Sequence, residues 1–215
     1  MKFGENDMKS FLDSCVVINF LEFGFGNTLL KKKCFDYISK EERFLFCFYT
    51  LGEIKTFIRK REIQLNEILR KKQDQSYQFG TNKETEFLKK SDFIFIEKLY
   101  DELKGFECSI LNEKFEYQIR TIRLQFDLFL KNKISDISIK PLEVKKEILS
   151  VIYDFLGDYA DCRILASAIQ MQQNREQFLF VTADRHFSEG TYDYIKKDIR
   201  LKEYEKPVLL NLLYN

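Results

Sequence analysis

Residues 11–18 of the chain read FLDSCVVI, and this stretch decides the fold. The apolar residues on both sides of Asp13 predict a buried strand that turns into a short helix, which ends near Gly24 and Gly26. A short strand that is apolar throughout is typical of a parallel sheet with both faces covered. Asp13 then stands where the strand ends and the helix begins, at the edge of the sheet where α/β proteins bind their ligands.

Three more acidic residues occupy similar positions. Glu53 follows the apolar run 44–49 by one short turn, Asp161 opens a helix rich in small residues, and Asp184 ends the apolar strand 178–183. In a parallel sheet, strand ends and helix starts share one edge, so the four acids are expected to lie together. Their carboxylates would repel one another unless a cation lay between them. Because hard divalent cations prefer oxygen ligands, the pattern predicts a Mg²⁺ or Mn²⁺ site.

The rest of the chain predicts one α/β domain over residues 1–215, with a central, mainly parallel sheet and a helical insertion at about 62–140. Helices are expected at 31–39, from Thr50 onward, at 62–79, 84–104 and 108–133, and after Pro141. The inner face of the helix after Pro141 is expected to contain Leu142, Ile148, Val151, Ile152 and Phe155. Further strands are expected at 44–49 and 208–213.

Composition excludes several classes of protein. Hydrophobic residues make up 45% of the 215, enough for a sizeable core. The five cysteines form no CxxC pair, and a single histidine disfavours histidine-type zinc sites and Ser-His-Asp triads. The chain has no apolar run of about 18 residues, so we expect a cytoplasmic protein with no membrane partner.

Each acid also has an ordinary structural interpretation. Thr50 and Glu53 match a capping box, Asp161 and Asp13 could be helix N-caps, and Asp184 could hold an Asx turn. Four unrelated caps, however, would be indifferent to which edge of the sheet they occupied. Their shared edge favours a common chemical role.

Four blocks in this order resemble the PIN-domain nuclease family: FLDSCVVI at 11–18, TLGEI at 50–54, DxxILAxA at 161–168 and VTADxxF at 181–187. The resemblance implies a PIN-like three-layer fold and a metal-dependent endoribonuclease, in which water attacks an RNA phosphate and leaves a 5′-phosphate and a 3′-hydroxyl. It also implies Mg²⁺ or Mn²⁺ as the cofactor. The catalytic and metal-binding acids that it implies are Asp13, Glu53, Asp161 and Asp184. Thr182 and Ser14 would be supporting hydroxyls.

The middle of the chain departs from this pattern. Glu53 and Asp161 lie 108 positions apart, more than in the compact ribonucleases of toxin–antitoxin pairs. Asp158, three residues before Asp161, is a further metal ligand, the third acid of the site in place of Asp161, or an acid exposed on a loop. The resemblance implies RNA as the substrate and leaves an antitoxin or other protein inhibitor, and a homodimer, open as partners.

Basic residues are concentrated in the middle segment. Residues 54–150 carry an excess of four positive charges. The candidate nucleic-acid-binding residues are Arg59, Lys60, Arg61, Arg70, Lys71, Lys72 and Arg185. The alternative is that these side chains form an ordinary solvated helix surface. Arg185 and its neighbour His186 could equally contact a phosphate or lie on the surface.

Two other functions are compatible with the acids. Asp13 could be the covalent nucleophile of a haloacid-dehalogenase-like phosphohydrolase, although that family has a second Asp two positions later, where this chain has Cys15. The chain could also be a catalytically inactive PIN-like scaffold that binds RNA or a protein.

Overall fold

The computed structural model describes residues 9–40, 43–136, 144–175 and 177–214. The chain divides into two compact units: Met1–Ile54 with Asp127–Asn215, called the α/β unit, and Lys55–Phe126, called the helical unit. The helical unit begins and ends earlier than the insertion expected at about 62–140, of which 137–140 lies outside the described residues. Both boundaries fall inside long helices, where the sequence has no breaking residue to mark them.

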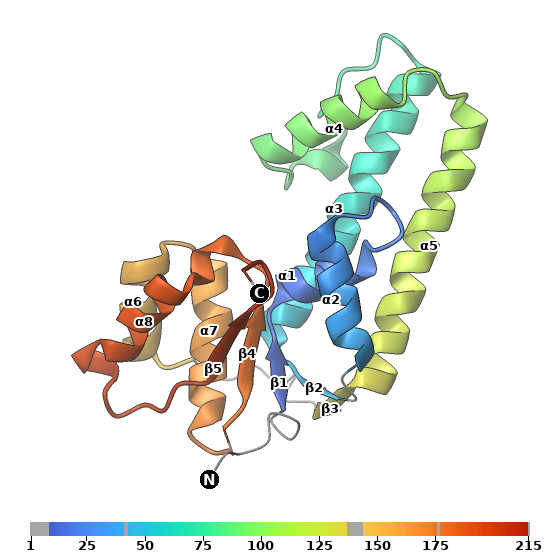
Figure 1. Cartoon of the computed structure of the whole chain (residues 1–215). Helices are drawn as coiled ribbons and strands as arrows, with labels where there is room; N and C mark the ends of the chain where they lie inside the picture. Colours follow the sequence, from blue (N-terminus) through green and yellow to red (C-terminus); the bar gives the residue numbers. More distant parts are fainter. Residues whose placement is uncertain (1–8, 41–42, 137–143, 176, 215) are drawn as a thin grey trace. The chain divides into compact units, whose positions relative to one another are not determined.

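The described strands form a five-stranded sheet in the order β3-β2-β1-β4-β5, and all neighbouring pairs are parallel (Figure 1). The strands are β1 Ser10–Leu12, β2 Phe44–Leu45, β3 Ile134–Asp136, β4 Leu179–Thr182 and β5 Val208–Asn211. The prediction of a mainly parallel sheet, with the Asp13 strand central and beside the Asp184 strand, is therefore confirmed.

Helices cover both faces of this sheet (Figure 1). They are α1 Ser14–Leu21 and α2 Leu29–Lys40 on one face, and α6 Lys146–Leu156, α7 Tyr159–Gln172 and α8 Glu189–Lys197 on the other. On the α2 side, the Tyr37 hydroxyl lies 2.7 Å from the Ser10 hydroxyl, and its ring packs against Phe44. On the other side, Phe11 and Phe180 join the core formed with α6, α7 and α8. The strands are apolar on both faces because both are covered, giving a three-layer α/β unit.

The helical unit contains most of α3 Phe48–Gln73 and α5 Cys108–Lys133, with η1 Lys83–Thr85 and all of α4 Lys90–Glu102. Its core consists of aliphatic and aromatic residues from α3, α4 and α5: Leu65, Ile68, Leu69, Ile96, Tyr100, Leu111, Phe115 and Ile119. None of the described helices has the length and apolar character needed to cross a bilayer.

The long helix predicted at 108–133 is confirmed by α5, whose buried residues recur at three- and four-residue intervals. The helix expected at 62–79 ends earlier, at Gln73, because Asp74 forms a turn by accepting a hydrogen bond from the Ser76 amide at 2.8 Å. The segment 84–104 contains η1 and then α4 rather than one helix.

The strand expected at 44–49 is wrong beyond Leu45, because α3 begins at Phe48. Thr50 therefore lies inside α3 and is not its N-cap, so the capping box with Glu53 is also wrong. A continuous apolar run does not distinguish a buried strand from the buried start of a helix.

The helix expected after Pro141 is observed as α6, although Pro141 and Leu142 themselves lie outside the described residues. Ile148, Val151 and Ile152 are buried as predicted. The prediction for Phe155 is wrong, since this residue is exposed. It lies in the last turn of α6, at the edge of the layer, before Gly157 ends the helix with φ of 69°.

Candidate metal centre

Asp13 is held at the end of β1 by a dense set of hydrogen bonds. It is the N-cap of α1, and its Oδ1 accepts from the Ser14 amide at 2.6 Å. Its Oδ2 accepts from the Thr182 hydroxyl at 2.7 Å and from the Cys15 thiol at 2.9 Å. Asp13 is 2% exposed, and these three donors are all neutral groups. Asp13 is therefore fixed in orientation, and no cation of the described residues is hydrogen-bonded to it.

Glu53 is linked to Asp13 through Ser14. The Ser14 hydroxyl donates to Glu53 Oε2 at 2.5 Å and lies 3.4 Å from Asp13 Oδ1. Glu53 lies in the second turn of α3, and the hydroxyl of Thr50 in the same helix reaches back to the Leu12 carbonyl at 3.5 Å. The start of α3 is thus tied to the end of β1, which places Glu53 beside Asp13. Ser14 bridges the two acids as a supporting hydroxyl.

Asp161, Asp184 and His186 form the tightest group of candidate metal ligands among the described residues. One ligand atom of each lies within 4.8 Å of the others. His186 Nδ1 is 3.0 Å from Asp161 Oδ2 and 3.4 Å from Asp184 Oδ1. The sequence predicted Asp161 and Asp184 as ligands together with Asp13 and Glu53, but not His186. Asp184 is the N-cap of η2 Arg185–Phe187 and accepts from the His186 amide at 2.8 Å, which holds the residue that carries the imidazole.

Asp158, and not Asp161, is the N-cap of α7. Its Oδ1 accepts from the amides of Ala160 at 2.8 Å and Asp161 at 3.3 Å. The plain-cap interpretation of Asp161 is therefore wrong, because the helix begins at Tyr159, two residues earlier than expected. This frees the Asp161 carboxylate to face His186. The Asp158 carboxylate orients the first turn of α7 and lies near enough to add negative charge to the cluster.

Electrostatics distinguish this cluster from ordinary caps. Burial, together with a smaller contribution from neighbouring acids, raises the pKa of Glu53 to about 7 and that of Asp161 to about 6. Burial also raises the pKa of Asp13, with an added contribution from Asp184. The hydrogen bond to Asp161 raises the pKa of His186, which stabilises an imidazolium between two carboxylates. The cluster concentrates negative charge that a cation would stabilise.

The donor chemistry fits the ions expected from the sequence. Four carboxylates supply the oxygen ligands that Mg²⁺ and Mn²⁺ prefer, and the imidazole of His186 becomes a further ligand once a metal ion displaces its proton. Asp161, Asp184 and His186 could contact an ion directly. Glu53, which is partly exposed, could receive a hydrogen bond from one of its water ligands.

Thr182 and Asn211 hold the segment that carries Asp184. The Thr182 hydroxyl accepts from the Asp184 amide at 3.1 Å while it donates to Asp13. The side-chain amide of Asn211 donates to the carbonyls of Asp184 at 2.7 Å and Phe187 at 2.8 Å. Sequence reasoning missed Asn211, Cys15 and the ligand position of His186. The available signal for Asn211 was one polar residue at the end of an apolar strand.

The predicted nucleic-acid-binding residues of α3 have contacts within the helical unit. Lys60 pairs with Asp92 at 3.0 Å, and Arg70 pairs with Glu67 at 2.8 Å and with Glu84 at 3.0 Å. Other contacts include those of Arg59 with the Phe87 ring, Arg61 with the rings of Phe57 and Phe95 and with the Gln64 side chain, Lys71 with the Gln75 and Tyr77 carbonyls, and Lys72 with the Lys104 carbonyl. These contacts favour a structural role for the basic clusters. Arg185, in the α/β unit, is exposed beside His186.

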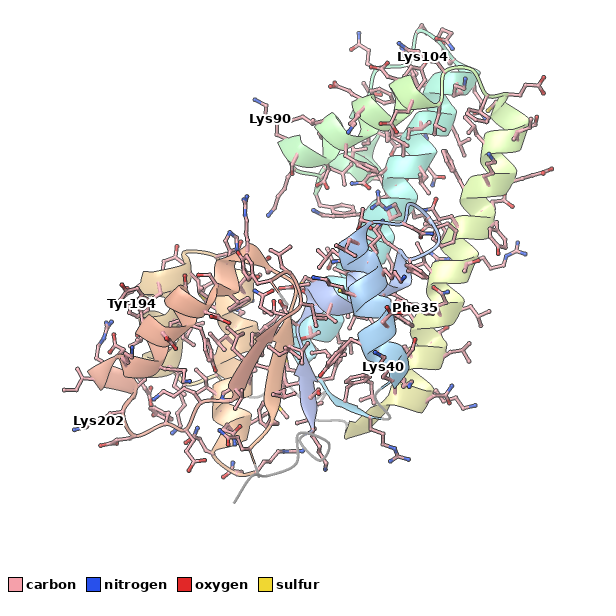
Figure 2. All side chains as sticks on the ribbon, viewed as in Figure 1. Phe35, Lys40, Lys90, Lys104, Tyr194 and Lys202 are labelled. Atoms are coloured by element: carbon pink, nitrogen blue, oxygen red, sulfur yellow. The ribbon has the colours of Figure 1, made fainter. Side chains whose placement is uncertain are left out.

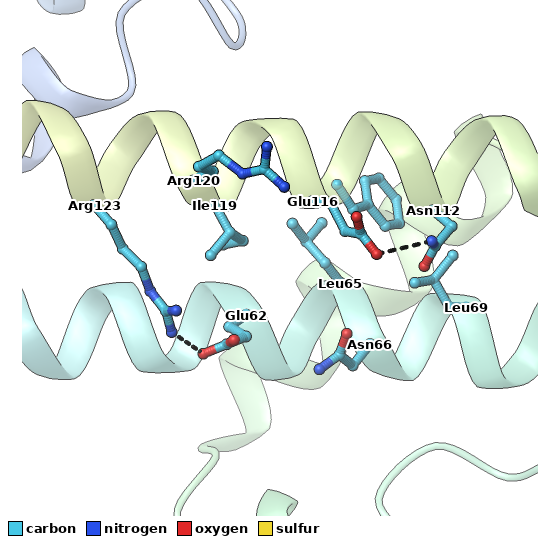
Figure 3. Close-up of a pocket in the computed structure, with 10 residues that line it drawn as sticks. Glu62, Leu65, Asn66, Leu69, Asn112, Glu116, Ile119, Arg120 and Arg123 are labelled. Carbon is cyan, nitrogen blue, oxygen red and sulfur yellow. Dashed lines mark hydrogen bonds and ion pairs between the residues drawn. The ribbon is translucent and has the colours of Figure 1, made fainter.

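The helical unit also contains a pocket of about 350 Å³ between α3 and α5 (Figure 3). Arg123 and Glu62 form an ion pair across it at 2.6 Å, and Asn112 donates to Glu116 at 3.0 Å. The polar groups of this pocket are matched in charge, in contrast to those of the acidic cluster.

Comparison of the chain with known protein families, with curated proteins and with solved structures found no match.

Proposed function

We propose that the chain is a metal-dependent endoribonuclease with a PIN-like fold, which hydrolyses RNA phosphodiester bonds at the acidic cluster. The observation that carries this proposal is the set of four carboxylates and one imidazole at a single edge of a parallel sheet. Burial and mutual repulsion raise the pKa of three of these acids, as is common where a protein holds groups for chemistry.

The fold supports the same proposal. The resemblance to PIN-domain nucleases requires a parallel sheet in which the Asp13 strand is central and adjoins the Asp184 strand. The observed order and direction of β1 and β4 agree with this requirement. Parallel sheets with helices on both faces host many functions, so the assignment depends on the acids more than on the fold.

Each residue has a separate task in this proposal. Asp161, Asp184 and His186 would hold the ion, while Asn211 and Thr182 keep the Asp184 turn in place. The partly exposed Glu53 would orient the attacking water, and the buried Asp13, bridged to Glu53 by Ser14, keeps Glu53 in position. When bound, a divalent ion lowers the pKa of water and stabilises the leaving oxyanion of a phosphodiester.

The haloacid-dehalogenase-like alternative is less well supported. A covalent nucleophile needs an oxygen that can reach a phosphorus atom. Asp13 is 2% exposed, and hydrogen bonds from Ser14, Cys15 and Thr182 occupy both of its oxygens. The thiol of Cys15, where that family has its second acid, donates to Asp13 instead of facing a substrate.

The test is cleavage of a labelled single-stranded RNA with Mn²⁺, with Mg²⁺ and with EDTA. We expect products with a 5′-phosphate when metal is present, and none in EDTA. Asp161→Asn and Asp184→Asn should remove the activity, whereas the matched control Asp193→Asn, an exposed acid of α8, should retain it. Cleavage that persists in EDTA would reject the proposal, and a folded wild type that does not cleave RNA with either metal would favour an inactive scaffold.

A further inference from the structure

A second pocket, of about 400 Å³, opens on the α/β unit beside the first turn of α7. Its lining comes from α6 and from the start of α7: Lys146, Leu149, Ser150, Tyr153, Asp154 and Tyr159. Leu149 and the two tyrosine rings form the apolar walls, and the rings meet edge to face with centroids 6.3 Å apart. Lys146 contributes a positive charge, and Asp154 is paired with Arg200 at 2.8 Å.

The aromatic wall is held in place from behind. The guanidinium of Arg163 lies 4.2 Å from the ring centroid of Tyr159 and 5.2 Å from that of Tyr49. Arg163 thus contacts the rings of Tyr159 and Tyr49, and it fixes the orientation of Tyr159. Tyr159 is nevertheless 50% exposed and Tyr153 is 48% exposed. Two large rings that are oriented by the protein and open to solvent form a binding surface that needs little further ordering.

The tyrosine wall is linked to the acidic cluster through Arg163 and Tyr49. Arg163 packs on the rings of both Tyr159 and Tyr49, and Tyr49 precedes Glu53 by four positions on the same face of α3. Tyr159 itself is two positions before Asp161 in α7, so these two side chains leave the helix on different sides. A polynucleotide with one phosphate at the acids would therefore bring a neighbouring nucleotide close to the tyrosines.

We propose that this pocket, called the tyrosine pocket, receives an unstacked base of single-stranded RNA next to the phosphate that is cleaved. This inference rests on the proposed function and adds a base-binding subsite to it. Nucleobases stack on exposed aromatic rings, and a side chain of Lys146 at the rim attracts the adjoining phosphate. A base in a duplex is already paired and stacked, so it cannot enter. The pocket therefore selects single strands.

Binding in EDTA tests the pocket separately from cleavage. The probe is a short fluorescent single-stranded RNA, and the affinities of wild type, Tyr159→Ala, Tyr153→Ala and Tyr159→Phe are compared. We expect each alanine variant to bind roughly 5- to 150-fold more weakly, since stacking on one ring contributes this much per base. Tyr159→Phe keeps the ring and should bind like the wild type. Tyr194, labelled on α8 and 68% exposed (Figure 2), provides the control Tyr194→Ala, which should have no effect.

A second probe identifies the contact as base stacking. A strand of the same length that has sugars and phosphates without bases should bind wild type and alanine variants equally. The proposal is overturned if wild type and both alanine variants bind the RNA with equal affinity, or if none of them binds it. It is also overturned if the alanine variants lose as much affinity for the base-free strand as for the RNA. Melting temperatures show whether a variant has lost its fold, and if one has, the result of the other alanine variant is used.

The outcomes for the pocket and for the nuclease can be told apart. Weaker binding by the alanine variants, together with a wild type that does not cleave with Mn²⁺, retains the pocket and rejects the nuclease. Cleavage by a wild type whose alanine variants bind RNA unchanged retains the nuclease and rejects the pocket.

Discussion

Two buried carboxylates, Glu67 in the helical unit and Asp13 in the α/β unit, have opposite surroundings. Glu67 accepts hydrogen bonds from the Arg70 guanidinium at 2.8 Å, the Tyr77 hydroxyl at 2.7 Å and the Gly80 amide at 2.9 Å. Asp13 is hydrogen-bonded to neutral groups, and its charged neighbours are other acids. The chain itself balances the charge of Glu67, whereas the charge around Asp13 is left for a ligand. This difference separates a buried acid that holds a fold from one that serves a function.

The largest effect is expected from removing one acid of the metal trio. Asp161→Asn or Asp184→Asn should lower RNA cleavage by more than about 100-fold, since even outer partners of metal ligands contribute about 10–100-fold. The melting temperature without metal should stay unchanged or rise, because each change relieves repulsion. Single-turnover cleavage and thermal unfolding of the same samples check this. A lost activity that accompanies a marked fall in melting temperature would instead assign these acids to the fold.

The opposite pattern is expected for Glu67→Gln. The substitution removes the charged acceptor of Arg70 and disturbs the bonds from Tyr77 and Gly80, and should lower the free energy of unfolding by about 2–3 kcal/mol. Urea unfolding measures this change, and cleavage per folded molecule should remain at the wild-type level. Glu62→Gln is the matched control, because its pair with Arg123 is exposed and should contribute less than about 1 kcal/mol. If both substitutions had equal effects on stability, Glu67 would not be the structural acid described here.

The pH dependence of stability should report the raised pKa values of the acidic cluster. Glu53 and Asp161 have folded-state pKa values of about 7 and 6, above their ordinary values of 4.5 and 3.8. The stability that these two groups contribute is therefore fully present below their unfolded-state pKa values, and it is lost as the pH rises through their folded-state pKa values. His186, whose pKa is also raised, changes in the same direction.

We compare the metal-free wild type with the metal-free Glu53→Gln, Asp161→Asn double variant. The melting temperature of the variant minus that of the wild type should increase as the pH rises from about 4 to 7. Scanning fluorimetry in EDTA over this range measures this difference. A difference that stays constant, or that shrinks toward neutral pH, would contradict the raised pKa values.

The smallest effect is expected from neutralising the basic clusters of α3. Lys71 already donates to the Gln75 and Tyr77 carbonyls, and Arg70 is paired with Glu67 and Glu84. The slope of the logarithm of RNA affinity against the logarithm of salt concentration reports the number of phosphate contacts. Lys71→Gln should therefore change this slope by less than the amount expected for one contact. Arg185→Gln, beside the acidic cluster, should flatten it by about one contact. A large loss of slope for Lys71→Gln would restore the prediction that α3 presents an RNA-binding surface.

Long periodic elements could be predicted from the sequence, and side-chain placement at turns could not. The bounds of α5 were predictable because Phe115, Ile119, Ile122 and Phe126 repeat at helical spacing, which constrains the whole segment. The start of α3 at Phe48 was not, since an apolar run of six residues suits either a strand or a buried helix start. Boundaries set by turns, such as Asp74 after α3, depend on local hydrogen bonds that periodicity does not detect.

The same contrast holds for the candidate site. The four acids could be placed at one edge because strand ends and helix starts coincide in a parallel sheet. The ligand position of His186 could not be inferred, since it results from a contact with Asp161, 25 residues earlier, through the turn that Asp184 caps. Asn211 likewise acts through a neighbouring strand, which a sequence without topology does not reveal.

Direct binding of Mn²⁺ is the measurement that tests the central claim, that the charge of the acidic cluster is left for a cation. Isothermal titration calorimetry of the metal-free protein should show Mn²⁺ binding by the wild type and by Glu67→Gln. Binding should be lost in the Asp161→Asn, Asp184→Asn double variant, which remains folded. A wild type that binds no Mn²⁺ at millimolar concentrations, or a double variant that binds it as the wild type does, would contradict the account.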